Sequence, residues 1–164
     1  MGFQFPGGIG QIEIDDVGTF DTNDSTTPSG FVITIDRNQI AKEGTEFPDP
    51  EAIKAELADD REVRMGVNQA MNIRLAELPI GDFDQLETQV DAGNEVFVKV
   101  TSSAKTSAGD PIWEVIYKKV ILSHILHGPV MVDRSSYGVV LLDGMCTGFN
   151  SDDIYSLTTN DPSA

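Results

Sequence analysis

Residues 62–75 read EVRMGVNQAMNIRL, and apolar side chains recur at almost every second position of this stretch. The alternating set comprises Val63, Met65, Val67, Met71, Ile73 and Leu75, and only Gln69 interrupts it. The side chains between them are polar or small. Because successive side chains of a strand point to opposite faces, this pattern predicts a long strand with one buried and one exposed face. A helical spacing would leave Met65 and Ile73 off the apolar face, so the strand is the preferred interpretation.

Further strands are predicted on both sides of this stretch. Alternating or β-branched runs indicate them at residues 31–35, 95–101, 112–122 and 130–142, the last broken near residues 135–136. Apolar residues on both faces of 112–122 predict that its second half is central and covered. Strands and long helices do not alternate along the chain, so a parallel α/β sheet is excluded. The expected fold class is mainly β, with an antiparallel sheet.

Two short helices are predicted beside the sheet. The first spans about residues 49–57, where Asp49 is a suitable N-cap and Ile53 and Leu57 share one helical face. The second spans residues 82–90, with Asp82 as N-cap and Gly93 as the stop. Its apolar face consists of Phe83, Leu86 and Val90.

The chain divides by composition into one domain with two polar ends. Residues 1–30 are rich in glycine and small polar residues, apart from a short alternating run at 11–15, and are interpreted as a flexible N-terminal arm. Residues 31–149 form the β domain, which carries a polar insertion at 36–61. Residues 150–164 are interpreted as a loose polar C-terminal tail.

Charge excludes several classes of partner. The 164 residues include 27 acidic and 11 basic ones, for a net charge of −16. Binding to phosphate backbones or anionic membranes requires clustered Lys and Arg, so neither is expected. No apolar run is long enough for a membrane span, and the first residues lack the features of a signal peptide. A soluble domain made in the cytosol, without a membrane anchor, is therefore expected.

The two histidines, His124 and His127, are the candidates for metal chemistry. On a helix this spacing would place both rings on one face, but on a strand an odd offset sends them to opposite faces. No glutamate lies between them to act as a base. A small metal-dependent hydrolase that uses His124, His127 and nearby acids is kept as the weaker, enzymatic alternative.

Other potential sites fail on their spacing or their neighbours. Asp21, Asn23 and Ser25 imitate the start of a calcium loop, but the required later glycine and glutamate are missing. The single cysteine, Cys146, could act as a nucleophile only with a histidine as base, and an inert half-buried thiol is the simpler interpretation. Trp113 with Tyr117 is interpreted as core. No catalytic residue, cofactor site or metal site is therefore predicted.

Three explanations compete for the acidic charge. It is typical of a salt-adapted organism, it suits a module that docks on a basic partner, and it suits a surface that DNA passes without sticking. The order of elements favours the third. Residues 62–78, the helix at 82–90, the strands 95–101 and 113–122 and the strand near 139–143 together resemble the tail tube proteins of long-tailed bacteriophages, over residues 31–145.

This resemblance implies a β-sandwich or partial barrel with a flanking helix. It also implies six copies in a ring, rings stacked into a tube, other tail proteins as partners, and DNA that passes through without specific binding. The protein would then reside in the virion tail after assembly in the host cytoplasm. In that family the segments equivalent to 1–30 and 36–61 contact the neighbouring ring, which makes Asp49, Glu51 and Lys54 candidate ring-stacking residues.

The same resemblance suggests which face lines the lumen or meets the next subunit. The candidates are the polar residues of the long strand and two further glutamates, namely Glu62, Arg64, Asn68, Asn72, Arg74, Glu95 and Glu114. The two arginines fit a repulsive lumen poorly, and the glutamates at 95 and 114 are the alternatives to that face. Other virion components (a tail terminator, a head–tail connector or a head-decoration protein) remain open as well.

Overall fold

The long strand predicted from residues 62–75 is part of the longest strand in the described structure. A computed structural model describes residues 8–15, 32–128, 135–150 and 154–160. Its strands are β1 (Ile9–Asp15), β2 (Val32–Asp36), β3 (Glu51–Glu56), β4 (Glu62–Pro79), β5 (Glu95–Ser102), β6 (Trp113–Leu126), β7 (Ser136–Gly148) and β8 (Tyr155–Thr159). The helix α1 (Ile80–Ala92) follows β4 directly, and η1 (Arg37–Gln39) is a single 3-10 turn. Strand β4 confirms the predicted strand, and its alternation of buried and partly exposed side chains holds from Val67 to Leu75, whereas Met65 is 59% exposed.

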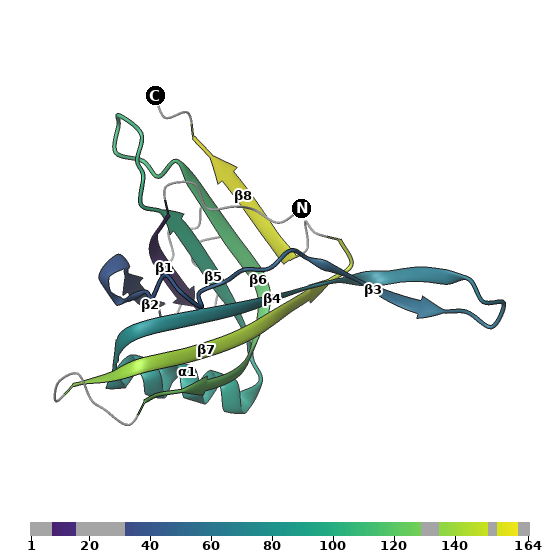
Figure 1. Cartoon of the computed structure of the whole chain (residues 1–164), viewed down its shortest axis with the longest axis horizontal. Coiled ribbons are helices and arrows are strands. Elements are labelled where there is room, and N and C mark those ends of the chain that lie inside the picture. The colour runs from purple at the N-terminus through teal and green to yellow at the C-terminus, as the bar shows by residue number, and fades with distance from the viewer. Residues whose placement is uncertain (1–7, 16–31, 129–134, 151–153, 161–164) are drawn as a thin grey trace, which may run out of the picture.

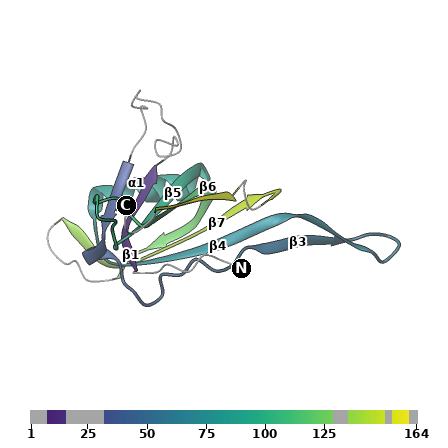
Figure 2. The same cartoon turned by 90° about the horizontal axis from the view of Figure 1, so that it is seen from above.

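The strands form one open antiparallel sheet, which confirms the predicted fold class. Its order is β2-β1-β5-β6-β7-β4-β3, and β8 pairs with the first half of β6. In Figure 1 strands β5, β6 and β8 run steeply while β4 and β7 run nearly level, so the sheet is strongly twisted. Helix α1 packs against β6, β4 and β7, and Figure 2 shows it beside the sheet.

One cluster of buried hydrophobic residues forms the core. Trp113 and Tyr117 are almost completely buried there, which confirms their assignment to the core. Phe47, which precedes β3, stacks on Tyr117 with ring centroids 5.2 Å apart. This contact joins the β6 half of the sheet to the β4 half. Removal of apolar surface from water is the main force that holds the two halves together.

Helix α1 begins earlier than its predicted cap. Its N-cap is Pro79, and Asp82 lies in the first turn instead of capping it. The reason is that β4 runs straight into the helix, so no separate polar residue is needed to start it; a carboxylate in the first turn is still favourable to the helix dipole. Phe83 and Leu86 are buried as predicted, and Gly93 ends the helix in the left-handed region with φ 67°.

The helix predicted at residues 49–57 is wrong, because residues Glu51–Glu56 form strand β3. A spacing of four between Ile53 and Leu57 fits a helix, but the backbone of this segment pairs with β4 from Glu51↔Asn68 to Glu56↔Glu62. The ladder of hydrogen bonds to an existing strand outweighs the weak preference of a short helix, which is marginal when isolated.

Both polar ends of the chain contribute a strand, contrary to the interpretation as a flexible arm and a loose tail. Strand β1 lies between β2 and β5 with Ile12 and Ile14 fully buried. Strand β8 pairs with residues Trp113–Tyr117 of β6. The rest of the predicted arm, including the Asp21, Asn23 and Ser25 loop, lies outside the described residues, as does the start of the strand predicted at 130–142.

Candidate assembly surface

Part of the polar insertion at 36–61 projects from the body as a two-stranded arm. Strand β4 pairs with β7 only from Val67 onward, so residues 62–66 pair with β3 alone. We call residues 53–66 the arm; it extends away from the sheet in Figures 1 and 2. None of the side chains from 53 to 65 is buried. A two-stranded ribbon without a covered face is marginally stable in water, so a surface that covers the arm would stabilise it.

Two features fix the root of the arm. The guanidinium of Arg64 donates to the carbonyl of Phe149 at 2.9 Å and to the Asn150 side chain at 3.0 Å. A side-chain carbon added at Gly66 would lie 2.7 Å from the carbonyl oxygen of Gly148, so only glycine lets β4 pass this close to the end of β7. The arm therefore leaves the body in a defined direction.

Charge at the end of the arm is unfavourable to the isolated chain. Glu56 and Glu62 are direct partners across the two strands, and like charges in this position destabilise a ladder. The ammonium of Lys54 is 3.9 Å from Glu62, and both side chains are well exposed.

Of the predicted ring-stacking residues, Lys54 and Glu51 lie on β3 and Asp49 lies exposed just before it.

The predicted lumen residues do not form one continuous face. Glu62 and Arg64 lie on the arm, whereas Asn68, Asn72 and Arg74 lie in the body, on the face of β4 opposite the buried Met71 and Ile73. Glu95 and Glu114 lie near opposite ends of the β5–β6 ladder, where Glu95 pairs with Ile121 and Glu114 with Thr101.

Glu114 is also close to Lys99, 3.7 Å from its ammonium. Along β5, Glu95 and Thr101, the partner of Glu114, are about 20 Å apart at 3.3 Å per residue, so the two glutamates proposed as alternatives lie far from each other.

A charged cluster occupies the middle of the outer sheet face. Arg74 Nη1 lies 2.8 Å from Asp143 Oδ1, and His124 Nε2 lies 2.8 Å from Asp143 Oδ2. Three strands thus converge on one carboxylate, which ties β4, β7 and β6 together. The alternation on β4 found Arg74, but its partners could not be assigned without the strand pairing.

Apolar pairs flank this cluster on the same face and were missed by the sequence analysis. Ile121 pairs with Met145 and Leu126 with Leu141, on either side of His124 and Asp143. Ile121, Met145 and Leu126 remain 39%, 43% and 54% exposed. We call these four apolar residues the outer patch. Apolar surface left open beside polar groups is typical of a protein–protein contact.

The position of this patch depends on a break in the alternation of β6, which no local sequence pattern predicted. Ile116 and Tyr117 are neighbours and both buried, and Lys119 has a positive φ of 55°. This irregularity reverses which residues face outward, so Ile121 leaves the core side. The predicted central position of β6 is correct, but its outer face in this half is less covered than expected.

The two histidines do not converge on a common site. His124 binds Asp143 on the outer face, whereas the His127 ring stacks on Tyr137 at 4.0 Å and meets the edge of Phe83 of α1. Among the described residues, no three His, Cys, Asp or Glu side chains gather into a group that could hold a metal ion.

The single cysteine is enclosed by the sheet. Cys146 is completely buried, and its thiol lies 3.6 Å from the carbonyl oxygen of Gln69. Burial raises the pKa of the Cys146 thiol to about 11. A nucleophilic cysteine requires a lowered pKa and access to substrate, so this environment is that of an inert core residue.

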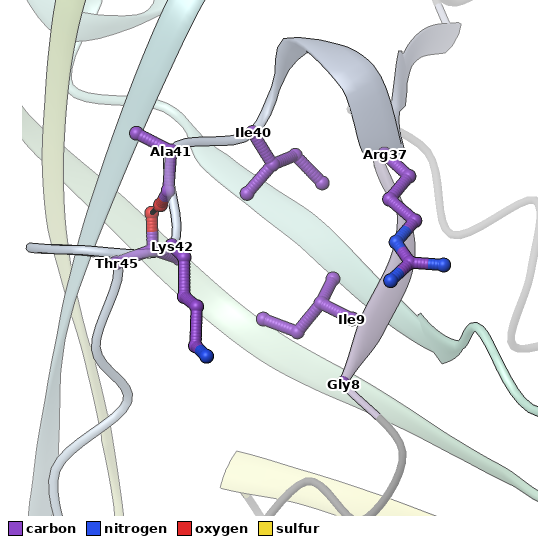
Figure 3. A pocket seen from close by; sticks show the side chains of 7 residues that line it. All are labelled: Gly8, Ile9, Arg37, Ile40, Ala41, Lys42 and Thr45. Atoms are coloured by element: carbon purple, nitrogen blue, oxygen red, sulfur yellow. Dashed lines mark hydrogen bonds between the residues drawn. The ribbon is translucent and has the colours of Figure 1, made fainter.

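A hollow of about 450 Å³ lies between β1 and the segment that leaves η1. Its lining consists of Gly8, Ile9, Arg37, Ile40, Ala41, Lys42 and Thr45, and we call it the basic hollow. In Figure 3 the side chains of Ile9 and Ile40 point into it, between Arg37 on one side and Lys42 on the other. The Thr45 hydroxyl donates to the carbonyl of Ala41 at 2.7 Å and so closes the turn beside Lys42.

Comparisons with known proteins give only distant matches. No protein-family model matches the sequence, and no curated protein matches it. The fold is similar to a chain of the anti-feeding prophage (AFP) baseplate, with a TM-score of 0.48, 8% identity and coverage of 93% of this chain and 94% of that chain.

It is also similar to a chain of the anti-feeding prophage tube-terminating cap, with a TM-score of 0.44, 11% identity and coverage of 98% and 95%. A double mutant of the Hcp1 protein from E. coli EAEC 042 gives a TM-score of 0.39 at 8% identity, covering 91% of this chain and 96% of that one. These similarities concern the path of the backbone alone. Function is therefore inferred from this chain's own residues.

The described helices include none that is long and apolar enough to cross a bilayer.

Proposed function

We propose that this chain is a structural subunit of a phage tail tube that assembles into stacked hexameric rings around an acidic channel for DNA. The observation that carries the proposal is the arm, a ribbon exposed on both faces that gains a covered surface only in an assembly. The role is non-catalytic, and the partners are further copies of the chain and other tail proteins.

Contacts within a ring have two available surfaces. The outer patch offers apolar area on β6 and β7. In the described part of the chain, β2 pairs only with β1, so its second edge is free to extend the sheet of a neighbour. Closure of a ring pairs or covers such surfaces without a change of fold.

Contacts between rings are assigned to the arm, and the channel to the acidic surface. The chain has 27 acidic and 11 basic residues, and its net negative charge repels the phosphates of a duplex, so DNA passes without adhering. Asn68, Asn72 and Arg74, or Glu95 and Glu114, are the candidates for residues that face the channel or the next subunit.

Negative-stain electron microscopy of the purified protein, across concentrations and at two salt levels, tests the proposal. Hollow tubes of stacked rings are the expected result, whereas single closed rings would indicate a tail terminator. Protein that stays monomeric at every concentration and salt level contradicts the proposal.

An arm deletion assigns the stacking role. Ile53 and Gly66 are register partners, so they can be joined by Asn-Gly in place of residues 54–65, which suits a two-residue hairpin. The expected product is isolated rings with an unchanged circular dichroism spectrum. Tubes of normal length would remove the arm from the stacking contact.

A further inference from the structure

The basic residues that line the basic hollow have no acidic partner in the described structure. The chain has 11 Lys and Arg residues, and ion pairs occupy Lys54, Arg61, Arg74 and Lys99. Among the described residues, neither Arg37 nor Lys42 forms an ion pair, and both are exposed. In a chain of net charge −16, two cations in one hollow without a carboxylate in its lining are an unusual local excess of positive charge.

The chemistry of the hollow defines what fits there. Ile9 and Ile40 form an apolar floor, and both also pack against the hydrophobic core. Arg37 and Lys42 lie on either side of this floor (Figure 3). A matching ligand combines one apolar side chain with flanking negative charges, which is the composition of a short acidic peptide turn.

The end of the arm has this composition. Leu57 is 36% exposed and is followed by Ala58, Asp59 and Asp60, with Glu56 before it. The turn is closed by hydrogen bonds from Leu57 N to Arg61 O and from Asp60 N to Leu57 O. Asp60 has a positive φ of 66°, a conformation that Asp tolerates better than most residues. The turn therefore presents its leucine and its carboxylates in a fixed arrangement.

We infer that the arm of one copy docks in the basic hollow of the next copy, with Leu57 on the isoleucine floor and the carboxylates at the tip beside Arg37 and Lys42. The inference deepens the proposed stacking contact and rests on it. The tip of the arm and η1, which borders the hollow, lie toward opposite ends of the molecule in Figure 1. The contact joins two different surfaces, so it can repeat from copy to copy.

Docking also relieves two electrostatic costs. The cations of the hollow offset the repulsion between Glu56 and Glu62, which face each other in the free arm. They also provide local attraction between two strongly acidic copies, whose net charges otherwise oppose association.

Charge reversal with mixing tests this contact. The arm-reversed protein carries Glu56→Lys and Glu62→Lys, which keeps like charges opposite each other across the two strands and replaces the exposed Lys54–Glu62 ion pair with two cations. The hollow-reversed protein carries Arg37→Glu and Lys42→Glu. A control with Glu87→Lys and Asp91→Lys on the exposed face of α1 has the same change in net charge as the arm-reversed protein. Association is measured by sedimentation velocity and negative-stain microscopy.

We expect each reversed protein alone to need a concentration at least about tenfold higher for stacking than wild type. An equimolar mixture of the arm-reversed and hollow-reversed proteins should restore stacking, because each reversed tip then meets a hollow of opposite charge. The helix control should stack alone, and its mixture with the hollow-reversed protein should stack less than the arm-reversed mixture.

The outcomes separate the contact from the proposed function. If wild type forms tubes but the reversals change nothing, or if mixing fails to restore stacking, this inference is overturned while the tube assignment stands. A wild-type chain that never associates removes both.

Discussion

Arg74 and Asp143 face each other across β4 and β7, with Nη1 and Oδ1 2.8 Å apart and the second carboxylate oxygen bound by His124. The pair is largely shielded from solvent, with side-chain exposures of 26% and 18%. A charged hydrogen bond in such a place contributes more than one in open water. It lies at the centre of the outer face and links the strand that carries the arm to the strand beside it.

The first prediction concerns this cluster. Asp143→Asn removes the charge that both Arg74 and His124 use, and we expect a loss of about 1.5 kcal/mol in the free energy of unfolding, measured by urea titration. The control is Asp59→Asn, since Asp59 pairs with Arg61 at 2.6 Å on the exposed arm. Its expected effect is within about 0.5 kcal/mol. Equal losses of unfolding free energy in the two variants would show that the cluster around Asp143 stabilises the fold no more than an exposed ion pair.

A second prediction concerns Cys146. Its raised pKa of about 11 and its burial keep the thiol protonated and enclosed at neutral pH, so a disulfide reagent should react slowly with native protein and rapidly in urea. The unfolded thiol releases its proton near the ordinary cysteine pKa of 9.0, which lies below the pKa of the folded protein. Stability should therefore fall as pH rises from 9 toward 11. Rapid reaction of native protein at pH 7 would place the thiol at the surface.

The third prediction tests backbone strain in β7. Val139 has a φ of 52°, a left-handed conformation that is costly for a β-branched residue, and its side chain is 63% exposed. Val139→Asn should raise the free energy of unfolding by about 0.5–1 kcal/mol, because Asn tolerates this conformation. The matched change Val32→Asn, at a half-exposed position in a regular strand, should lower stability instead. Thermal unfolding of dilute protein measures both, and a loss at 139 would argue against strain there.

The fourth prediction concerns the root of the arm. Gly66→Ala places a carbon 2.7 Å from the Gly148 carbonyl oxygen, so β4 and β7 must separate locally, at a cost of about 1–3 kcal/mol. Gly81→Ala is the control, since an added carbon there meets nothing within 4 Å and the site is helical. It should stabilise by up to about 1 kcal/mol. Urea titration distinguishes the two variants. An unchanged free energy of unfolding in Gly66→Ala would show that β4 and the end of β7 separate at no cost.

Elements with strong periodicity could be predicted from the sequence. The period of two between Val63 and Leu75 predicted the strand, but its buried face holds only from Val67 to Leu75, because Met65 lies on the arm and is 59% exposed. Gln69 lies on the buried face with its amide donating to the carbonyl of Pro48 at 2.9 Å. Helix α1 was found from Phe83 and Leu86. These signals are local, so they survive without knowledge of the partners.

The missed elements depend on partners that are distant in sequence. Strand β8 is short, and its pairing with residues Trp113–Tyr117 of β6 determines its structure. Strand β3 shows a helical spacing that the ladder with β4 overrides. The candidate site was predicted only in part for the same reason. Arg74 was identified, but the outer patch depends on the reversal of β6 near Lys119, which no local pattern predicted.

Residues 36–61 carry both the two cations of the basic hollow and the tip of the arm within one continuous stretch. If the two dock on each other, a single recombination event that replaces this stretch exchanges Arg37, Lys42 and the tip together, while Ile9 of the hollow and Glu62 of the arm are retained. The recombinant chain would recognise itself and reject its parent. Two lineages can thus change the specificity of this contact in one step, without passing through a form whose tip and cations are mismatched.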